Sequence, residues 1–385
     1  MRILHMCLGA FFIDNYSYQE NLLPKYHKME GHDVSVIASL VTFDENGKAT
    51  YLEKGSVYEN EYGIEVTRLN YKTNSKWAKR FRYFEGTYEA IEKYNPDVIF
   101  IHNIQFMDIK EVVRYLKKHP NVKVYADNHA DFSNSATTFV SKNILHKIFW
   151  RYCAKKINPY VIKFYGVLPA RVDFLRDVYK LPKEKIELLV MGADDEKVIE
   201  AESEESIREM REKLGADDDD FLIMTGGKID KWKTQTLLLM DAVNNIKDKK
   251  VKLVVFGSVV PELKEEVNKR CSEKVKYIGW IQAKDSYKYF ATCDIAVFPG
   301  RHSVFWEQVC GQGKPVIVKK WAGTTHVDLN GNCIFLENDS EEEIYNVLEE
   351  ILKKDREKYK EMLECAQNAG KEMFLYSKIA DRSIK

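Results

Sequence analysis

Short apolar runs alternate with amphipathic stretches along almost the whole chain. Runs such as 3–8 and 97–102 are typical of strands buried on both faces of a parallel sheet. The stretch 18–30 instead repeats its apolar residues at helical spacing and ends at a glycine. Strands that alternate with helices in this way predict right-handed β-α-β units. We therefore expect an α/β protein, with a parallel first sheet.

Length divides this pattern into two domains. A chain of 385 residues is too long for one core and suits two domains of about 190 residues each. The segment 195–212 turns acidic and polar, and we take it as the linker and first helix of the second domain. The boundary is therefore expected near residue 195, and a last short helix is expected at 374–384.

Charge narrows the range of partners. The formal net charge is zero, from 59 basic and 59 acidic residues, so we expect no nucleic-acid partner. The basic residues are unevenly spread, with 18 Lys/Arg against 8 Asp/Glu between Arg68 and Lys163. Two stretches there, 72–84 and 141–157, mix basic with aromatic side chains. Such segments can lie on an anionic membrane, although a basic amphipathic helix is more often a packed surface helix.

Cysteine spacing and hydropathy bear on localisation. The seven cysteines are scattered and form no C-x-x-C pair, which is typical of small core residues in a reducing cytosol. No apolar run reaches the length of a membrane span, and we see no signal peptide before the first strand. We expect a cytoplasmic protein, with any membrane contact peripheral and at the inner face of the cell membrane.

The stretch 298–318, FPGRHSVFWEQVCGQGKPVIV, contains the strongest candidate chemistry. It predicts a strand end, a tight loop, a helix that Ser303 caps, and another buried strand. Unpartnered N–H groups at a helix start favour a phosphate. Glu307, one turn into the helix, could accept hydrogen bonds from a ribose diol. The plainer alternative is an ordinary strand–helix unit with a surface glutamate.

A second candidate is the loop GGKIDKWK, which follows an apolar strand at 221–227. Lys228 and Lys233 lie five positions apart across this strand-to-helix connection and could both face one anion. The alternative is a pair of ordinary solvated lysines. We expect Lys233 and Glu307 to project into a cleft.

In the first domain, candidate residues follow the buried strands. Gly9 follows the first strand, but the G-x-G-x-x-G pattern is absent, so no dinucleotide site is expected. His102 and His129 follow two later strands, where the ligand crevice of an open sheet lies, and the alternative for each is a loop histidine. Asp127, His129 and Asp131 form a D-x-H-x-D run that makes only a weak metal site, and we expect no metal.

In combination these motifs resemble the retaining, family 4-like glycosyltransferases of the GT-B fold, of the bacterial surface-polysaccharide type. The resemblance covers nearly the whole chain. The motifs are LLVMGAD (188–194), GGKIDKWK (226–233), VVFGS (254–258), YIGWI (277–281), the stretch CDIAVFPG…WEQVCGQGKPVIV and FLYSKIADRS (374–383). It implies two Rossmann-like doubly wound parallel-sheet domains facing a central cleft. An acceptor-side domain would cover 1–195 with a crossing helix at 371–385, and a nucleotide-sugar-binding domain 196–370.

The resemblance also implies roles for individual residues. His129 would contact the donor sugar at the reaction centre, and Lys228 and Lys233 would neutralise the donor diphosphate, which makes these three the catalytic candidates. Glu307 would hold the nucleotide ribose. The remaining donor-binding candidates are backbone positions: Gly9, Gly227, Ser303 and Val304.

The implied reaction transfers a hexose or hexosamine from a nucleotide diphosphate sugar, with a UDP-sugar favoured, to a glycan or lipid-linked glycan. No cofactor or metal is implied. One departure concerns an earlier glutamate that binds the sugar in the family, because here the loop reads Gly-Arg-His-Ser at 300–303. A GT-B epimerase or phosphorylase and a non-catalytic glycosyltransferase-like partner are the alternatives. No hydrolase-type carboxylate pair is apparent, which disfavours a glycosidase.

Overall fold

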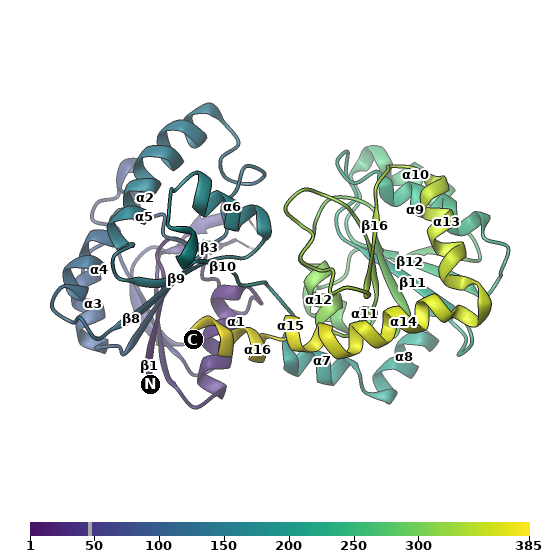
Figure 1. Cartoon of the computed structure of the whole chain (residues 1–385), viewed down its shortest axis with the longest axis horizontal. Coiled ribbons are helices and arrows are strands. Elements are labelled where there is room, and N and C mark those ends of the chain that lie inside the picture. Colours follow the sequence, from purple (N-terminus) through teal and green to yellow (C-terminus); the bar gives the residue numbers. More distant parts are fainter. Residues whose placement is uncertain (45–47) are drawn as a thin grey trace. The chain divides into compact units, whose positions relative to one another are not determined.

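The first unit is built on an eight-stranded sheet. The computed structural model describes residues 1–44 and 48–385, apart from the side chain of residue 354. Met1–Val190 and Ile379–Lys385 form the first unit, and Met191–Lys378 form the second (Figure 1). The sheet order is β10-β9-β8-β7-β1-β2-β6-β5. Its strands are β1 (Arg2–Cys7), β2 (Asp33–Ala38), β5 (Ser56–Glu59), β6 (Glu65–Arg68), β7 (Val98–Ile101), β8 (Lys123–Asn128), β9 (Val161–Gly166) and β10 (Ile186–Leu188).

Helices cover this sheet. They are α1 (Gln19–Met29), α2 (Lys76–Phe81), α3 (Thr87–Tyr94), α4 (Ile109–Leu116), the π-helix Ser141–Trp150, α5 (Arg151–Ile157) and α6 (Pro169–Asp177). Helices α3, α4 and α5 pack side by side (Figure 1). Their apolar residues join those of β1, β7 and β8 in one buried core. Most residues of β1 and β7 are apolar and buried, as is typical of strands in the centre of a parallel sheet.

The second unit has a six-stranded sheet in the order β13-β12-β11-β14-β15-β16, in which all paired strands are parallel. Its strands are β11 (Phe221–Gly226), β12 (Val251–Phe256), β13 (Val275–Tyr277), β14 (Ile295–Phe298), β15 (Val316–Lys319) and β16 (Cys333–Leu336). Its helices are α7 (Asp195–Ala201), α8 (Glu204–Leu214), α9 (Gln235–Asn245), α10 (Lys264–Lys269), α11 (Ser286–Thr292), α12 (Phe305–Gly311), α13 (Glu341–Leu352), α14 (Glu357–Cys365) and α15 (Lys371–Phe374).

The last helix, α16 (Tyr376–Ser383), begins in the second unit, and its residues from Ile379 onward belong to the first. The prediction of two α/β domains with parallel sheets is confirmed. In the described part of the chain, no helix is long and apolar enough to cross a bilayer.

The first sheet differs from expectation at one edge. Strand β5 runs antiparallel to β6, so the prediction of a wholly parallel first sheet is wrong there. A hairpin of β3 (Val41–Phe43) and β4 (Ala49–Tyr51) also forms around the stretch DENGK at 44–48, whose turn-forming residues predict only the tip of a loop. Both strands are short and half-exposed, so they lack the continuous apolar run that marks a buried strand. Residues 45–47 of the expected loop tip lie outside the described residues.

Candidate functional site

Two loops meet at the carboxyl edge of the second sheet. Strand β11 pairs with β12 on one side and β14 on the other, so the strand order reverses between β11 and β14. In open α/β sheets the ligand crevice lies beside such a reversal. The lysine loop follows β11, and the loop that leads to α12 follows β14. An added Cβ at Gly300 would lie 3.5 Å from Lys233 Cγ, so the two loops are in contact.

Glycine is required where β11 ends. Gly227 has φ of +123°, and a Cβ at Gly257 would lie only 2.0 Å from the Gly227 carbonyl oxygen. An L side chain is strained in the first position and sterically blocked in the second. The backbones that follow β11 and β12 are therefore closely packed, and glycine is needed at both positions.

The two candidate lysines differ in their surroundings. The Lys233 ammonium lies 3.7 Å from the position of a Cβ on Gly227, so it reaches back over the end of β11. Burial lowers the pKa of Lys233, and the Asp230 carboxylate opposes that shift. Lys228 is 62% exposed, with its ammonium 3.8 Å from Asp230. Lys233 is thus a partly desolvated cation at the strand end, and Lys228 is a solvated one beside it.

The start of α12 differs from the prediction. Helix α12 begins at Phe305, and its N-cap is Val304, with no side-chain cap hydrogen bond. The expected cap by Ser303 is therefore wrong. Ser303 lies one position too early, and only a long 3.5 Å contact joins its Oγ to the Phe305 N–H.

Glu307 has no exposed surface, so the expectation that it projects into a cleft is wrong. His302 Nε2 and His326 Nε2 each donate to its Oε1 at 2.8 Å. Oε2 has no partner among the described residues. Burial would raise the pKa of Glu307, but the two histidines outweigh it and hold that pKa well below the usual range. The carboxylate is therefore charged, with one oxygen still able to accept a hydrogen bond.

In the first unit, Gly9 and His129 line one cavity of about 400 Å³ at the carboxyl ends of β1 and β8. A Cβ at Gly9 would lie 2.0 Å from the Asn103 carbonyl oxygen, so only glycine fits between the loops after β1 and β7. Asn103 Oδ1 accepts a hydrogen bond from the His129 N–H at 2.9 Å. The sheet order reverses between β1 and β7, so this cavity also lies where a ligand crevice is expected.

The His129 imidazole faces a buried carboxylate. Its Nε2 lies 3.4 Å from Asp127 Oδ2, an ion-pair distance without hydrogen-bond geometry. Burial alone would lower the pKa of His129, but Asp127 and then Glu20 raise it above the ordinary value. His129 is therefore biased toward the imidazolium form while part of its side chain remains exposed to the cavity.

His102 lies behind this cavity and has no exposed surface, so it is not a ligand-contacting residue in this structure. It belongs to a buried row of hydrogen-bonded histidines. His102 Nδ1 lies 2.9 Å from Asp127 Oδ2, and its Nε2 lies 3.0 Å from His5 Nδ1. His5 Nε2 lies 2.9 Å from His27 Nδ1, and His27 Nε2 lies 3.1 Å from the Ala380 carbonyl oxygen.

The D-x-H-x-D run is not a ligand cluster here. Asp131 pairs with Arg171 at 3.2 Å, so it does not turn toward Asp127 and His129. Within the described ranges, the residue groups with metal-ligand geometry are His302–Glu307–His326 and Asp217–Asp219–Asp220. Sequence reasoning missed His326 as a partner of Glu307, because it follows in a loop with no motif.

Comparisons with known proteins agree with this geometry. Residues 220–354 match the family model described as "Glycosyl transferases group 1". That segment includes both loops at the carboxyl edge of the second sheet and excludes the first unit. No curated protein sequence matches the chain.

Solved structures resemble the whole chain. A glycosyltransferase from Rickettsia africae is 15% identical with a TM-score of 0.64, covering 99% of this chain and 96% of that one. HepE of Anabaena, solved with UDP, is 18% identical with a TM-score of 0.65, covering 99% and 98%. The UDP-GlcNAc 2-epimerase of Neisseria meningitidis is 12% identical with a TM-score of 0.64, covering 100% and 99%. The chain therefore has the predicted GT-B fold, and the family match over residues 220–354 supports a glycosyltransferase.

Proposed function

We propose that this protein transfers a hexose or hexosamine, with retention, from a nucleotide diphosphate sugar to a glycan or lipid-linked glycan in surface-polysaccharide synthesis. A UDP-sugar is the favoured donor. The observation that carries the proposal is the contact between the Lys233 loop and the loop before α12, at the strand reversal of the second sheet. Both loops lie within the segment that matches the glycosyltransferase model.

In this mechanism the leaving group is a nucleoside diphosphate, so the barrier falls when its developing charge is stabilised. Lys233, partly desolvated at the end of β11, supplies positive charge where that charge is screened little by water. Lys228 adds a second cation at the rim. Glu307 Oε2, which has no partner among the described residues, is the acceptor for a ribose hydroxyl, and the buried carboxylate has to become exposed to bind it.

We assign the third catalytic role to His129, which belongs to the first unit. Its raised pKa makes it a hydrogen-bond donor with positive charge at neutral pH. An imidazolium of this kind stabilises the diphosphate as the bond between the sugar and phosphate breaks.

A nucleotide-sugar epimerase is the second candidate, because the Neisseria epimerase shares the fold over the whole chain. A thermal-shift screen of nucleotide sugars identifies the donor. The labelled donor is then incubated with glycan acceptors. Label transferred to an acceptor supports the proposal, whereas an epimerised or released sugar with no transfer contradicts it. Donor binding without any turnover indicates a non-catalytic partner.

Turnover is expected to need no divalent cation, because Lys228 and Lys233 supply positive charge for the diphosphate. Transfer measured with excess chelator should match the untreated rate. A rate lost with chelator and restored only by magnesium or manganese contradicts this prediction. In that case Ala in place of His326 would test whether the His302–Glu307–His326 group holds the ion.

The first unit is expected to bind anionic vesicles weakly. Val140, Ile144, Ile148 and Tyr152 are all exposed at helical spacing along 140–152. Basic residues flank them at Lys142, Lys147, Arg151 and Lys155. Each basic residue near an anionic surface contributes roughly 1 kcal/mol, and added salt screens that attraction. Flotation should therefore show binding to vesicles with phosphatidylglycerol at low salt, and none to neutral vesicles.

The double variant I144S/I148S should weaken this binding, because it removes apolar side chains that insert between headgroups. The matched control is V57S/I199S, which replaces two aliphatic residues exposed elsewhere. Equal flotation of both variants and the unmodified chain would exclude this helix as a membrane contact.

A further inference from the structure

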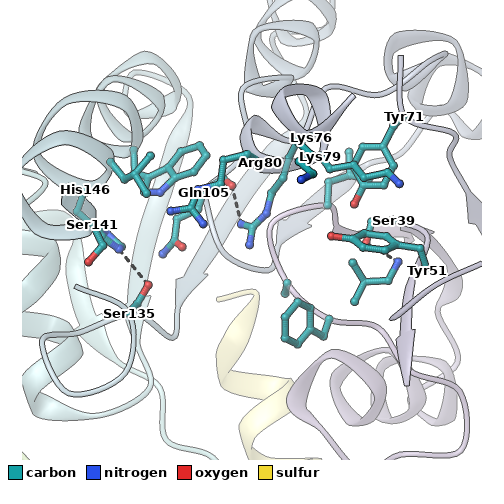
Figure 2. Close-up of a pocket in the computed structure, with 17 residues that line it drawn as sticks. Ser39, Tyr51, Tyr71, Lys76, Lys79, Arg80, Gln105, Ser135, Ser141 and His146 are labelled. Atoms are coloured by element: carbon teal, nitrogen blue, oxygen red, sulfur yellow. Dashed lines mark hydrogen bonds between the residues drawn. The ribbon is translucent and has the colours of Figure 1, made fainter. Parts of the chain in front are cut away.

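A second cavity, of about 570 Å³, adjoins the one that contains His129. Five residues line both cavities: Ala10, Phe11, Arg82, Gln105 and Ser135. Most of the rest of its wall comes from α2, the β3–β4 hairpin and the π-helix Ser141–Trp150. Figure 2 shows Lys76, Lys79 and Arg80 between Tyr51 and Tyr71 on one side and Ser141 and His146 on the other.

The cavity is lined by four basic residues and by no acidic residue. They are Lys76, Lys79, Arg80 and Arg82. None of the four forms an ion pair within the described ranges, although Lys79 lies 4.6 Å from the centre of the Tyr51 ring. Uncompensated positive charge in a concave site favours an anionic ligand.

Two backbone carbonyl groups hold the guanidinium of Arg82 in place. Its Nη1 donates to the carbonyl oxygens of Gly9 at 2.8 Å and Gln105 at 2.6 Å. Its other guanidinium nitrogens make no hydrogen bond to the described residues, so they remain available as donors. Because Gly9 lines the His129 cavity, Arg82 fixes positive charge at the junction of the two cavities.

The positive charges of this cavity also act on a buried histidine, His146. His146 lines the cavity and is hydrogen-bonded to Ser135 Oγ and Tyr179 Oη, both at 2.9 Å. Burial, and then the charges of Arg82 and Arg80, lower its pKa to about 4. His146 is therefore neutral at physiological pH, and the charge of this cavity comes from its lysines and arginines.

We propose that this cavity binds a phosphate or diphosphate group of the acceptor while the acceptor hydroxyl enters the adjoining cavity at His129. The inference rests on the proposed function, and it names the acceptor as a phosphate-bearing glycan. A diphosphate carries two to three negative charges and many acceptor oxygens, which suits four cations. A single carboxylate offers one charge and would leave most of them uncompensated.

The probe is inorganic pyrophosphate, titrated calorimetrically into the full-length chain at low salt. The background variant is K228Q/K233Q, which weakens diphosphate binding in the second unit. We expect this background to bind pyrophosphate, and the further changes K76Q/K79Q/R80Q to weaken that binding at least about tenfold through lost charge-assisted hydrogen bonds. The matched control K117Q/K155Q/K156Q removes three exposed lysines of the same unit and should leave the affinity unchanged.

A second readout follows His146 by NMR in the same background. Pyrophosphate in the cavity should raise the pKa of His146 from about 4, because the anion offsets the charges of Arg80 and Arg82. Unchanged affinity in K76Q/K79Q/R80Q, or a His146 resonance that pyrophosphate does not move, overturns the proposal.

Vesicle flotation and nucleotide binding show whether the phosphate that these residues bind belongs to a lipid headgroup, to the nucleotide donor or to the acceptor. If K76Q/K79Q/R80Q loses flotation with phosphatidylglycerol but keeps pyrophosphate affinity, these residues serve the lipid headgroups and the cavity is not the site. With Lys228 and Lys233 intact, the same variant should bind nucleoside diphosphate normally. The two proposals can fail separately. If the chain binds pyrophosphate in this cavity but binds no nucleotide sugar, the phosphate site stands and the proposed transferase function is wrong.

Discussion

Lys233→Ala and Glu307→Gln are each expected to lower kcat/KM for the nucleotide-sugar donor by a factor on the order of 10 to 1,000. Lys233→Ala removes the cation that lies over the end of β11. Glu307→Gln removes the charge to which we assign ribose binding while keeping one oxygen for the two histidine donors. Steady-state transfer kinetics with the donor found in the thermal-shift screen measure both effects.

Glutamine is the appropriate replacement because Glu307 is buried. Glu307→Ala would leave the His302 and His326 donors without their acceptor, and an unsatisfied buried hydrogen-bonding group costs about 1–3 kcal/mol of folding free energy. Lys231→Ala is the matched control for Lys233, since Lys231 is an exposed lysine of the same loop whose ammonium lies over Trp232. Wild-type kinetics for Lys233→Ala would mean that the diphosphate binds elsewhere.

His129→Ala is expected to lower kcat roughly 100-fold or more, while nucleoside diphosphate binding stays near normal. The reason is that His129 lines the cavity of the first unit and not the loops of the second. Turnover and calorimetric binding of the nucleotide separate the two effects. His119→Ala, a histidine stacked on Tyr115 in the same unit, is the control. Equal loss of nucleotide binding and turnover would give His129 a structural role.

The pH profile tests the same residue. Because Asp127 raises the pKa of His129, the imidazolium persists to higher pH than in an ordinary histidine. If the imidazolium is the active form, kcat falls as pH rises through that raised pKa. Asp127→Asn removes the raising charge, so the fall should move to lower pH in a variant whose circular dichroism is unchanged. An unshifted profile would exclude this pair as its origin.

The sequence predicted the framework of the fold because buried parallel strands are marked locally. The runs at 3–8, 97–102 and 221–227 are mostly apolar, and each coincides with a strand in the centre of its sheet. Strands β3, β4 and β5 were missed because they are partly or largely solvent-exposed and only three or four residues long. Whether such a short segment forms a strand depends on which other segment lies beside it in the folded chain. The local sequence pattern does not indicate that neighbour.

The site was predicted less completely, for a related reason. The positions of Lys233 and Glu307 next to strand ends could be read from spacing. The burial of Glu307 could not, because it depends on His326, 19 residues further along the chain. In the same way Asp127 was placed in a loop motif, whereas the fold directs it toward His102, 25 residues before it.

The row of histidines behind His129 connects Asp127 to α16 through hydrogen-bonded rings. At its far end His27 Nε2 lies 3.1 Å both from the Ala380 carbonyl oxygen, which only accepts, and from Ser383 Oγ, which can donate or accept. Burial lowers the pKa of His27 to about 4 and that of His5 well below its ordinary value, so both rings are neutral at physiological pH. Which nitrogen of His27 carries its hydrogen therefore depends on the Ser383 hydroxyl.

At the near end Asp127 Oδ2 accepts from His102 Nδ1, and the same oxygen lies 3.4 Å from His129 Nε2. The carboxylate that raises the pKa of His129 is thus held in place by a row of rings that ends on α16, more than 350 residues from His27 in sequence.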